Sequence, residues 1–301
     1  MFTNNTSLII PTRNRPHFVK NLLQRFSDLS VHFFEIIVVD SSDNEYRGLV
    51  ENICKKFSAN YFYTWPSTSH QRNLGIEKKN SSTKYIMFLD DDIVFYDNAI
   101  LEMNEIIKKF QYIDDVAAYG FNQIQKENKT FFENIKNSKL CSYLGLYPDK
   151  PGIVMQSGWH SKILNLKEDI FADWIFTTVC IYKFDYIKNF RFDETLGRYA
   201  YLEDLDFSLN LRLINKKIFI SSKAKFTHPK NIDRSSFDFG VLEVTNRYKI
   251  VKKHNLSTFH FTAMSLFRFF ISFCGIFSLN KKLFFRSFGN IAGLIKSIRK
   301  H

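Results

Sequence analysis

The sequence predicts an α/β protein in which a mixed, mostly parallel sheet is flanked by helices and followed by a basic helical C-terminal extension. Short apolar runs alternate with longer mixed segments over the N-terminal third of the chain, which is typical of parallel strands joined by helices. One of these runs, residues 85–89 (YIMFL), leads directly into three aspartates. The C-terminal segment, residues 244–301, contains 11 Lys or Arg and no Asp or Glu.

The composition is that of a folded protein. Of the 301 residues, 45% are hydrophobic, and 33 Phe, 14 Tyr and 3 Trp are too many aromatic side chains to remain in water. With 11 Gly and 6 Pro, collagen-like and low-complexity chains are excluded. Of the formal charge of +12, +11 lies in the segment 244–301, because positions 1–243 hold 31 basic and 30 acidic side chains.

Cysteine usage and the N-terminus predict a protein that stays in the cytoplasm. The four cysteines are far apart in sequence, so neither paired zinc ligands nor a disulfide framework is expected. Residues 1–10 have no basic start and no long apolar stretch, so a secretory signal is not expected.

Strands and helices alternate over residues 1–110. Residues 7–10 are predicted to form the first strand, ended by Pro11, and Pro16 opens a helix with apolar side chains on one face. Residues 33–39 (FFEIIVV) form a nearly continuous apolar run, as expected of a strand buried on both faces. The remaining predictions are helices at 49–57, 71–79 and 97–109 and strands at 61–64 and 85–89.

The second half of the chain is less regular. Residues 120–173 show no sustained period and predict loops and short elements. Beyond them we expect a strand at 175–181, a short helix at 183–189, a helix at 201–213 and short strands at 217–221 and 225–228. These patterns predict one α/β domain over residues 1–230, with halves at 1–110 and 111–230, and a helical tail over 231–301.

Three aspartates follow the buried run at 85–89, where open α/β sheets bind ligands. Asp90, Asp91 and Asp92 repel one another unless a cation or water compensates for their charge. Mg²⁺ or Mn²⁺, bound through oxygen ligands together with a phosphate-bearing substrate, would compensate well. A solvated turn with Asp92 as a helix cap is the alternative, and the triplet alone does not decide between the two.

Other polar residues follow or precede the neighbouring strands of the same sheet. Asp40 could accept hydrogen bonds from a base or ribose, and Arg13 and Arg72 could contact phosphate oxygens. Each of these alone is more typical of a turn or a surface charge. Together they outline a nucleotide pocket that comprises Thr12, Arg13, Asp40, Ser42, Asp43, Arg72 and Asn73.

Taken in order, these segments resemble the family 2 glycosyltransferases, which have the Rossmann-like GT-A fold. The resemblance covers residues 1–230 approximately and rests on SLIIPTRNRP (7–16), EIIVVDSSD (35–43), RNLGI (72–76), YIMFLDDD (85–92) and FDETLGRYAYLEDLDFSLNLR (192–212). It implies a hexosyltransferase-type enzyme that moves a sugar from a nucleotide diphosphate donor to an acceptor hydroxyl, with inversion at the anomeric carbon. The expected setting is the synthesis of a surface polysaccharide or glycolipid.

The resemblance also implies roles for individual residues. The aspartate triplet matches the DxD motif, with Asp92 the expected direct metal ligand, Asp90 a further ligand, and Asp90 and Asp91 beside the donor. Glu203 and Asp204 match the family's ED pair, in which the aspartate is the catalytic base. The other nucleotide-binding positions match Pro11, Thr12, Arg13, Asp40, Asp43 and Arg72. A UDP-sugar is the expected donor, although DSSD (40–43) replaces the family's DDGS pattern.

Simpler interpretations exist for some of these residues. His228 is a candidate third metal ligand, because GT-A enzymes sometimes complete the metal shell with a histidine in this region, and a hydrogen-bonded turn histidine is the alternative. Glu203 and Asp204 would also favour the helix macrodipole in a first turn. Asp206 points elsewhere on the predicted helix and is expected at the surface.

Charge balance is consistent with sugar transfer. Breaking the sugar–phosphate bond leaves extra negative charge on the diphosphate, which Mn²⁺ or Mg²⁺ would stabilise. Asp204 could take the proton of the acceptor hydroxyl on the opposite face of the sugar. The QxxRW motif of processive synthases is absent, which predicts a non-processive enzyme, and the absence of GxGxxG and GxxxxGK[ST] argues against dehydrogenases and P-loop NTPases.

Two other functions remain as alternatives. A nucleotidyltransferase that makes the sugar nucleotide would share the sheet and the carboxylates, but it should have a glycine-rich loop where residues 11–16 (PTRNRP) have no glycine. A nucleic-acid-binding protein would use the basic tail. The aspartate triplet would then repel phosphates without a metal, so no nucleic-acid partner is expected.

The tail predicts membrane association. Residues 257–279 are rich in Phe, but Arg268 leaves apolar pieces of about ten residues on each side, shorter than the roughly 20 that span a bilayer. A helix in the headgroup layer, with Lys and Arg toward anionic lipid, fits better and predicts peripheral association with the inner face of the cell membrane, where lipid-linked acceptors lie. Packing on the catalytic domain, or a homo-oligomer interface, is the alternative.

Overall fold

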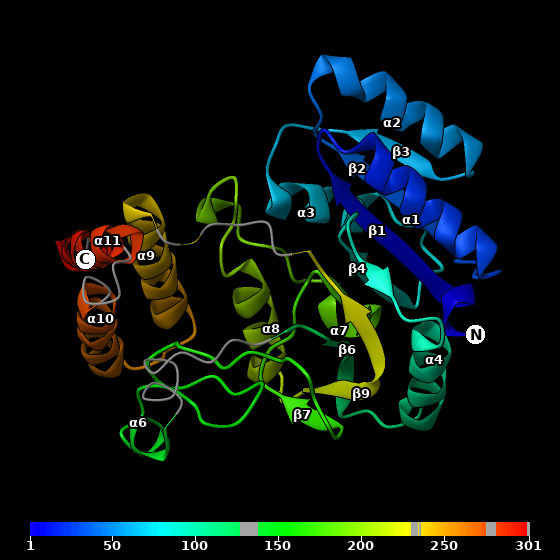
Figure 1. The fold of residues 1–301 in the computed structure, drawn as a ribbon. Coiled ribbons are helices and arrows are strands. Elements are labelled where there is room, and N and C mark those ends of the chain that lie inside the picture. Colours follow the sequence, from blue (N-terminus) through cyan, green and yellow to red (C-terminus); the bar gives the residue numbers. More distant parts are fainter. Residues whose placement is uncertain (127–137, 230–233, 235, 275–280, 300–301) are drawn as a thin grey trace. The chain divides into compact units, whose positions relative to one another are not determined.

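The computed structural model in Figure 1 describes residues 1–126, 138–229, 234, 236–274 and 281–299. The chain divides into two compact units. The first unit comprises Met1–Gln125 and Ile163–Pro229, and the second comprises Lys126–Lys162 and Lys230–His301. The division between Pro229 and Lys230 lies one residue before the expected start of the tail at 231, and residues 126–162 belong to the second unit instead of the 111–230 half.

The first unit is built on one mixed sheet. In the part of the chain that the structure describes, its strand order is β3-β2-β1-β4-β8-β6-β9-β5, with β7 paired to β9. β1 (Thr6–Thr12), β2 (Glu35–Asp40), β3 (Asn60–Tyr63) and β4 (Tyr85–Leu89) pair in parallel. They alternate along the chain with α1 (Pro16–Asp28), α2 (Asn44–Lys56) and α3 (Thr68–Lys78) (Figure 1). The predicted α/β class is confirmed.

The rest of the sheet is largely antiparallel. β8 (Val179–Lys183) runs antiparallel to β4 and to β6 (Val116–Gln123), and β6 is parallel to β9 (Lys217–Thr227). β9 is one strand where two were predicted, and β6 extends into the region for which no period was found. The remaining elements of this unit are η1 (Phe2–Asn5), β5 (Val94–Phe95), α4 (Ala99–Phe110), β7 (Ile170–Ala172), α7 (Phe184–Ile187), η2 (Glu194–Leu196) and α8 (Glu203–Leu213).

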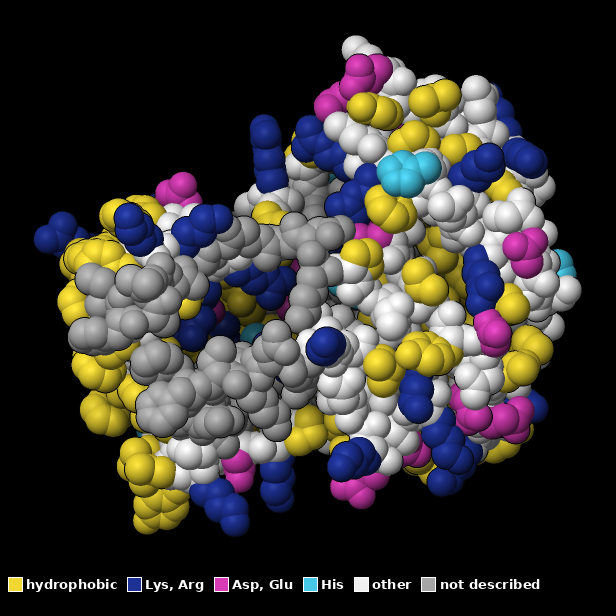
Figure 2. Space-filling view, in the orientation of Figure 1, with side chains coloured by type: hydrophobic (Ala, Val, Ile, Leu, Met, Phe, Trp, Pro, Cys, Tyr) yellow, Lys and Arg dark blue, Asp and Glu magenta, His cyan; other side chains and the backbone are white. Residues whose placement is uncertain are grey.

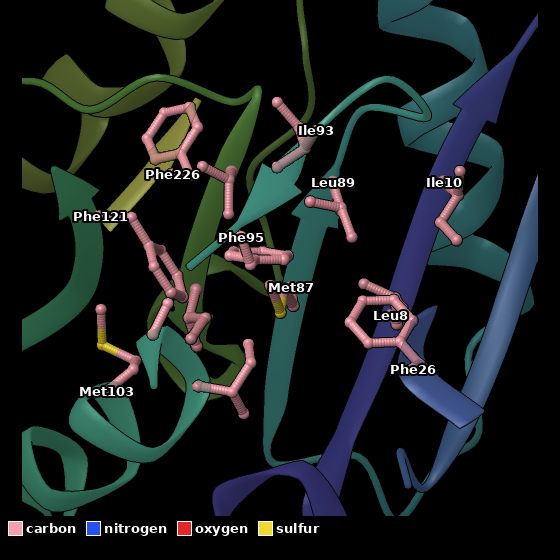
Figure 3. Packing of buried hydrophobic residues seen from close by; sticks show 14 of the residues in the cluster. Leu8, Ile10, Phe26, Met87, Leu89, Ile93, Phe95, Met103, Phe121 and Phe226 are labelled. Atoms are coloured by element: carbon pink, nitrogen blue, oxygen red, sulfur yellow. The ribbon is translucent and has the colours of Figure 1, made fainter. Parts of the chain in front are cut away.

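An apolar core lies between the sheet and its helices. Leu8 and Ile10 of β1 and Met87 and Leu89 of β4 alternate along their strands and meet Phe26 of α1 in one buried cluster (Figure 3). Burying a side chain of this size contributes roughly 1.5–3 kcal/mol. The core therefore fixes the two strands whose ends carry the polar residues of the predicted site.

β1 continues through Pro11 to Thr12, so the prediction that Pro11 ends the strand was wrong. Pairing with β4 stops at Ile9, so the missing amide proton of Pro11 falls beyond that ladder. Pairing with β2 continues and places Thr12 opposite Asp40. This register brings the ends of the first two strands side by side.

The second unit is helical in its described part. It contains α6 (Lys139–Tyr143), α9 (Phe237–Lys253), α10 (Thr258–Phe273) and α11 (Lys281–Arg299). Trp159 and Tyr147, which precede the helices of the tail by many residues, lie in one buried core with Val244, Phe261 and Leu294. This shared core explains why residues 138–162 belong with the tail. No described helix of the chain is long and apolar enough to cross a membrane.

A buried carboxylate, Glu243, lies among the three tail helices and faces three arginines. Nη2 of Arg286 lies 2.5 Å from Glu243 Oε2, Nε of Arg268 lies 3.9 Å from it, and Arg247 lies 4.0 Å from Oε1. Burial raises the pKa of Glu243, but Arg286, Arg268 and Arg247 lower it further and hold it well below its usual range. Arg268, which interrupts the apolar stretch in the sequence, therefore turns inward.

Candidate functional site

Polar side chains from several elements converge where the parallel strands of the first unit end. β1 ends at Thr12, β2 at Asp40 and β4 at Leu89, so the residues that follow leave the sheet at one edge. Thr12 Oγ1 donates a hydrogen bond to Asp91 Oδ2 at 2.6 Å, which joins the end of β1 to the aspartate triplet. The predicted convergence at this edge is present in the structure.

The three aspartates after β4 have different surroundings. Asp90 is half-buried and accepts a hydrogen bond from Arg72 (Nη2 to Oδ1, 2.9 Å). Asp91 and Asp92 are buried, with 4% and 7% of their surface exposed. A solvated turn, the alternative interpretation of the triplet, does not form.

Arg15 bridges the second and third aspartates. Its Nη1 donates to Asp91 Oδ1 at 3.1 Å and to Asp92 Oδ2 at 3.0 Å, while 43% of its side chain stays exposed. Sequence reasoning gave Arg15 no role. Its position could have indicated a role, because Arg15 is a basic residue on the loop between the end of β1 and the start of α1, and this loop leaves the sheet beside the triplet.

The charge states of this cluster follow from burial and ion pairing. Burial raises the pKa of Asp91 to about 6, although Thr12 and Arg15 act to lower it. Burial also raises the pKa of Asp92, but His228 and Arg15 outweigh it and leave that pKa below its usual range. Burial lowers the pKa of His228, and the ion pair with Asp92 raises it to a net value above normal. Asp92 is therefore ionised at neutral pH.

Asp92 and His228 form an ion pair whose distance also suits two ligands of one metal ion. His228 Nε2 lies 3.0 Å from Asp92 Oδ1, yet that buried oxygen accepts no hydrogen bond of proper geometry. Two adjacent ligands of an octahedral ion with bonds of about 2.1 Å lie about 3.0 Å apart. Among the described residues, no group of three or more His, Cys, Asp or Glu is arranged to hold a metal. The guanidinium of Arg15 pairs with both Asp91 and Asp92 in this conformation.

Arg72 is buried, with 2% of its surface exposed, and links Asp90 to Glu203. Its Nη1 donates to Glu203 Oε1 and its Nη2 to Asp90, while Ser69 Oγ donates to Glu203 Oε2 at 2.8 Å. We expected Arg72 to contact phosphate oxygens, and the structure instead places it in an internal network between α3, β4 and α8. Burial raises the pKa of Glu203 to about 7, although Arg72 and Ser69 act to lower it.

Asp204 follows Glu203 in the first turn of α8. It is half-buried, and its Oδ1 accepts a hydrogen bond from the amide of Leu205 at 2.8 Å. Leu202, directly before the helix, has a φ of 76°, a left-handed conformation that costs a residue with a side chain on the order of 1–3 kcal/mol. Asp206 is 1% exposed, so the expectation of a surface residue was wrong. The cause is that α8 is buried on most of its surface and has no wide solvent face.

The ends of β1 and β2 form the other part of the candidate site. Asp40 is buried and accepts hydrogen bonds from the amide of Ser42 and the hydroxyl of Tyr61, both at 2.9 Å. Asp43 is exposed and accepts from Arg13 at 3.3 Å and from Asn14 at 2.6 Å. The surface of this part is therefore the Arg13–Asp43 pair, with Asp40 beneath it.

Asn73 of the outlined pocket and Pro11, a position implied by the family resemblance, are both held in structural contacts. Asn73 exchanges hydrogen bonds with the backbone of Phe192 at 2.8 and 3.0 Å, which ties α3 to the segment before α8. Pro11 is buried within β1. Sequence reasoning also missed Ser69, Tyr61 and Asn14, whose partners lie far away in the chain and are set by the fold.

Comparison with known proteins agrees with the predicted fold. Residues 7–164, just over half of the chain, match the family model described as Glycosyl transferase family 2. An uncharacterized glycosyltransferase of Rickettsia bellii is 30% identical over 133 residues, which cover 44% of this chain and 19% of that protein. One of Rickettsia felis is 30% identical over 115 residues, covering 38% and 19%. The chain therefore spans about a fifth of the length of these relatives.

Solved structures show the same fold at low identity. Residues 1–349 of TarS from S. aureus superpose with a TM-score of 0.51 at 16% identity, covering 91% of this chain and 72% of that one. The mannosyltransferase PcManGT from Pyrobaculum calidifontis, solved in complex with GDP-Man and Mn²⁺, gives a TM-score of 0.53 at 10% identity, covering 99% and 76%. The predicted GT-A fold is confirmed.

Glu203 should make stability depend on pH. With a pKa of about 7 in the fold against 4.5 in the unfolded chain, it holds a proton that the unfolded chain releases. The free energy of unfolding should fall as the pH rises from about 4.5 to 7, by on the order of 3 kcal/mol. Glu203→Gln should lose this part of the slope, as measured by urea unfolding between about pH 5 and 8, while the smaller part that comes from Asp91 remains below about pH 6.

The matched control is Glu77→Gln, which removes the same group from the exposed surface of α3 and should keep the wild-type slope. A Glu203→Gln profile parallel to that of the wild type would show that this carboxyl does not titrate with a raised pKa.

Proposed function

Because the chain belongs to glycosyl transferase family 2, we propose that it is a metal-dependent, inverting hexosyltransferase that is non-processive. It would move a sugar from a nucleoside diphosphate donor to the hydroxyl of a glycan or lipid-linked acceptor in the synthesis of a surface polysaccharide or glycolipid. The observation that carries the proposal is the buried Asp92, which faces His228 on one side and Arg15 on the other at the end of β4. Family membership favours sugar transfer over nucleotidyl transfer and over nucleic-acid binding.

Asp92 and His228 would hold Mn²⁺ or Mg²⁺, with Asp90 as a further ligand. The ion would act as a Lewis acid that stabilises negative charge on the departing diphosphate. The presence of GDP-Man and Mn²⁺ in the PcManGT complex supports a sugar nucleotide and a metal for a protein of this fold. Thr12 holds Asp91 in place through a hydrogen bond, so Asp91 would shape the site. Because its pKa is raised to about 6, a fraction of the molecules would carry this carboxyl protonated near neutral pH.

Arg15 would change partners when the donor binds. Its guanidinium compensates part of the negative charge of Asp91 and Asp92 in this structure, and its partly exposed side chain lies on a loop at the sheet edge. A bound dication would supply that compensating charge instead. We propose that Arg15 then contacts the diphosphate, whose negative charge attracts it.

The nucleoside would lie along the ends of β1 and β2. Asp43 and Arg13 form the exposed surface there and could bind ribose hydroxyls and a phosphate, while Thr12 and Pro11 shape the floor. Asp40 supports this surface through Ser42. A UDP-sugar remains the expected donor, and a thermal-shift panel of nucleoside diphosphates with Mn²⁺ identifies the base.

Proton transfer is assigned to Asp204. It is half-buried in the first turn of α8 and could accept the proton of the acceptor hydroxyl as the sugar is attacked. Glu203 is assigned a positioning role, because Arg72 and Ser69 bind both of its oxygens. By fixing Glu203, this network would fix the start of α8 and with it the direction of Asp204.

A lipid-linked acceptor would be met at the inner face of the cell membrane. We therefore include peripheral membrane association of a cytoplasmic enzyme in the proposal, with an anionic lipid surface as partner. A homo-oligomer through the tail is the competing use of the same helices.

Asp92→Asn should remove metal-dependent activity. The change keeps the shape of the side chain but removes the charge that would bind the ion, so Mn²⁺-dependent donor hydrolysis should fall by roughly 100-fold. Asp97→Asn is the matched control, since Asp97 is an aspartate a few residues later with 83% of its side chain exposed. Unchanged hydrolysis in Asp92→Asn would remove the metal from the mechanism.

Asp204→Asn should separate donor binding from transfer. Nucleotide affinity, measured by calorimetry, should stay near that of the wild type, because Asp204 is assigned to the acceptor side. The transfer rate should fall by roughly 10²-fold or more, the scale on which a general base acts. Full transfer in this variant would mean that another residue takes the proton.

Arg15→Ala should strengthen Mn²⁺ binding in the absence of nucleotide. The variant removes the cation that competes for Asp91 and Asp92, so affinity measured from free Mn²⁺ by electron paramagnetic resonance should rise by about tenfold. Arg15→Lys keeps a positive charge and should stay close to the wild type. Equal or weaker Mn²⁺ binding in Arg15→Ala would contradict competition between this side chain and a metal.

A further inference from the structure

The exposed side of α10 is apolar along its whole length. Phe259, Leu266, Phe270 and Phe273 are 77%, 48%, 59% and 37% exposed. At 100° per residue these four positions fall within an arc of about 60° on the helix. Apart from Thr258 at its first position, every exposed residue of α10 belongs to this row, and none of them is charged.

α11 extends this surface and adds charge to it. Phe285, Phe288 and Ile295 are 58%, 44% and 46% exposed. The ring of Phe284 joins the two helices, because its centroid lies 5.2 Å from that of Phe273 on α10 and 5.2 Å from that of Phe288. The docking face is defined here as Phe259, Leu266, Phe270 and Phe273 of α10 with Phe284, Phe285, Phe288 and Ile295 of α11.

Exposed basic residues stand at both ends of α11. Lys281 and Lys282 precede the aromatic residues of the helix, and Lys296 and Arg299 follow them. Residues 244–301 contain no Asp or Glu, so α10 and α11 themselves carry no acidic side chain. Figure 2 shows hydrophobic side chains gathered over the α10 and α11 side of the second unit, with Lys and Arg nearby. Contiguous exposed apolar surface of this kind marks an interaction site.

We propose that the docking face inserts into the headgroup layer of a membrane that contains anionic lipid. Aromatic side chains would enter the boundary between headgroups and acyl chains, while Lys281, Lys282, Lys296 and Arg299 would meet lipid phosphates. The surface differs from the single helix expected from sequence. Arg268 points to Glu243, and the charge that faces lipid comes from α11.

Charge complementarity selects lipid over a second copy of the chain. Two docking faces packed together would bring two basic rims into contact, with no acid between residues 244 and 301 of either copy to pair with them. Nucleic acid would pair with the rim but would leave the aromatic rows in water. An anionic membrane satisfies both parts of the surface.

This inference rests on the proposed function only for its purpose, the delivery of a lipid-linked acceptor. Membrane binding itself is measured without substrate, and donor hydrolysis is measured without vesicles. Failure of one therefore leaves the result for the other intact.

The test is flotation of the full chain with vesicles of phosphatidylcholine alone and of phosphatidylcholine with phosphatidylglycerol. We expect binding to the anionic vesicles, and the double change Phe270→Glu with Phe285→Glu should reduce the bound fraction by about tenfold or more. Both side chains are exposed, so folding and Mn²⁺-dependent donor hydrolysis should be retained. The double change Leu266→Ser with Phe288→Ser, which adds no charge, should also reduce binding to the anionic vesicles, but by less.

The matched control is Tyr112→Glu, which places the same charge at an aromatic residue of the first unit with 91% of its surface exposed. This control should float like the wild type, and Lys296→Gln with Arg299→Gln should weaken binding to anionic vesicles more than to neutral ones. Three results would overturn the inference: no flotation of the wild type, flotation of the Phe270→Glu and Phe285→Glu variant at the wild-type level, or a concentration-dependent dimer or a DNA complex that forms through this face without vesicle binding.

Discussion

The site depends on positive charge that compensates the negative charge of three adjacent carboxylates at the end of a buried strand. Asp90, Asp91 and Asp92 cannot all be buried and ionised unless positive charge lies against them. The fold supplies a different cation to each region of the triplet: Arg72 from α3, Arg15 from the loop after β1, and His228 from the residue after β9. Three distant segments are thereby drawn to one edge of the sheet, and a cation that enters this edge must compete with the protein's own charges.

Much of the fold follows from local patterns in the sequence. The apolar run at residues 85–89 forms β4 with the predicted bounds, and the parallel order of the first four strands agrees with their alternation with helices. β6, β8 and β9 were predicted poorly, because their pairing depends on strands far away in the chain. Register shifts between β6 and β9 show that neither strand is regular on its own. Residues 127–137, part of the segment without a predicted pattern, lie outside the described residues.

The position of the site could be predicted from the sequence, but the pairing of its charged side chains could not. Parallel strands end at one edge, so Thr12, Asp40 and the triplet could be placed together from their positions alone. Which arginine pairs with which carboxylate depends on the fold. Arg15 reaches the aspartates from a loop in which Asn14 has a φ of 56°. Arg72 pairs with Glu203, which lies 131 residues further along the chain. Such pairings have no periodic signal in a sequence.

The central claim is that the end of β4 holds a cation against the diphosphate of a donor. Anomalous scattering from crystals grown with Mn²⁺ and a nucleoside diphosphate tests it most directly. The account predicts a manganese peak within about 2.5 Å of a carboxylate oxygen of Asp92, with His228 beside it and Arg15 moved away from Asp91 and Asp92. A bound nucleotide with no peak at this edge, and with Arg15 still bridging the two aspartates, would contradict it.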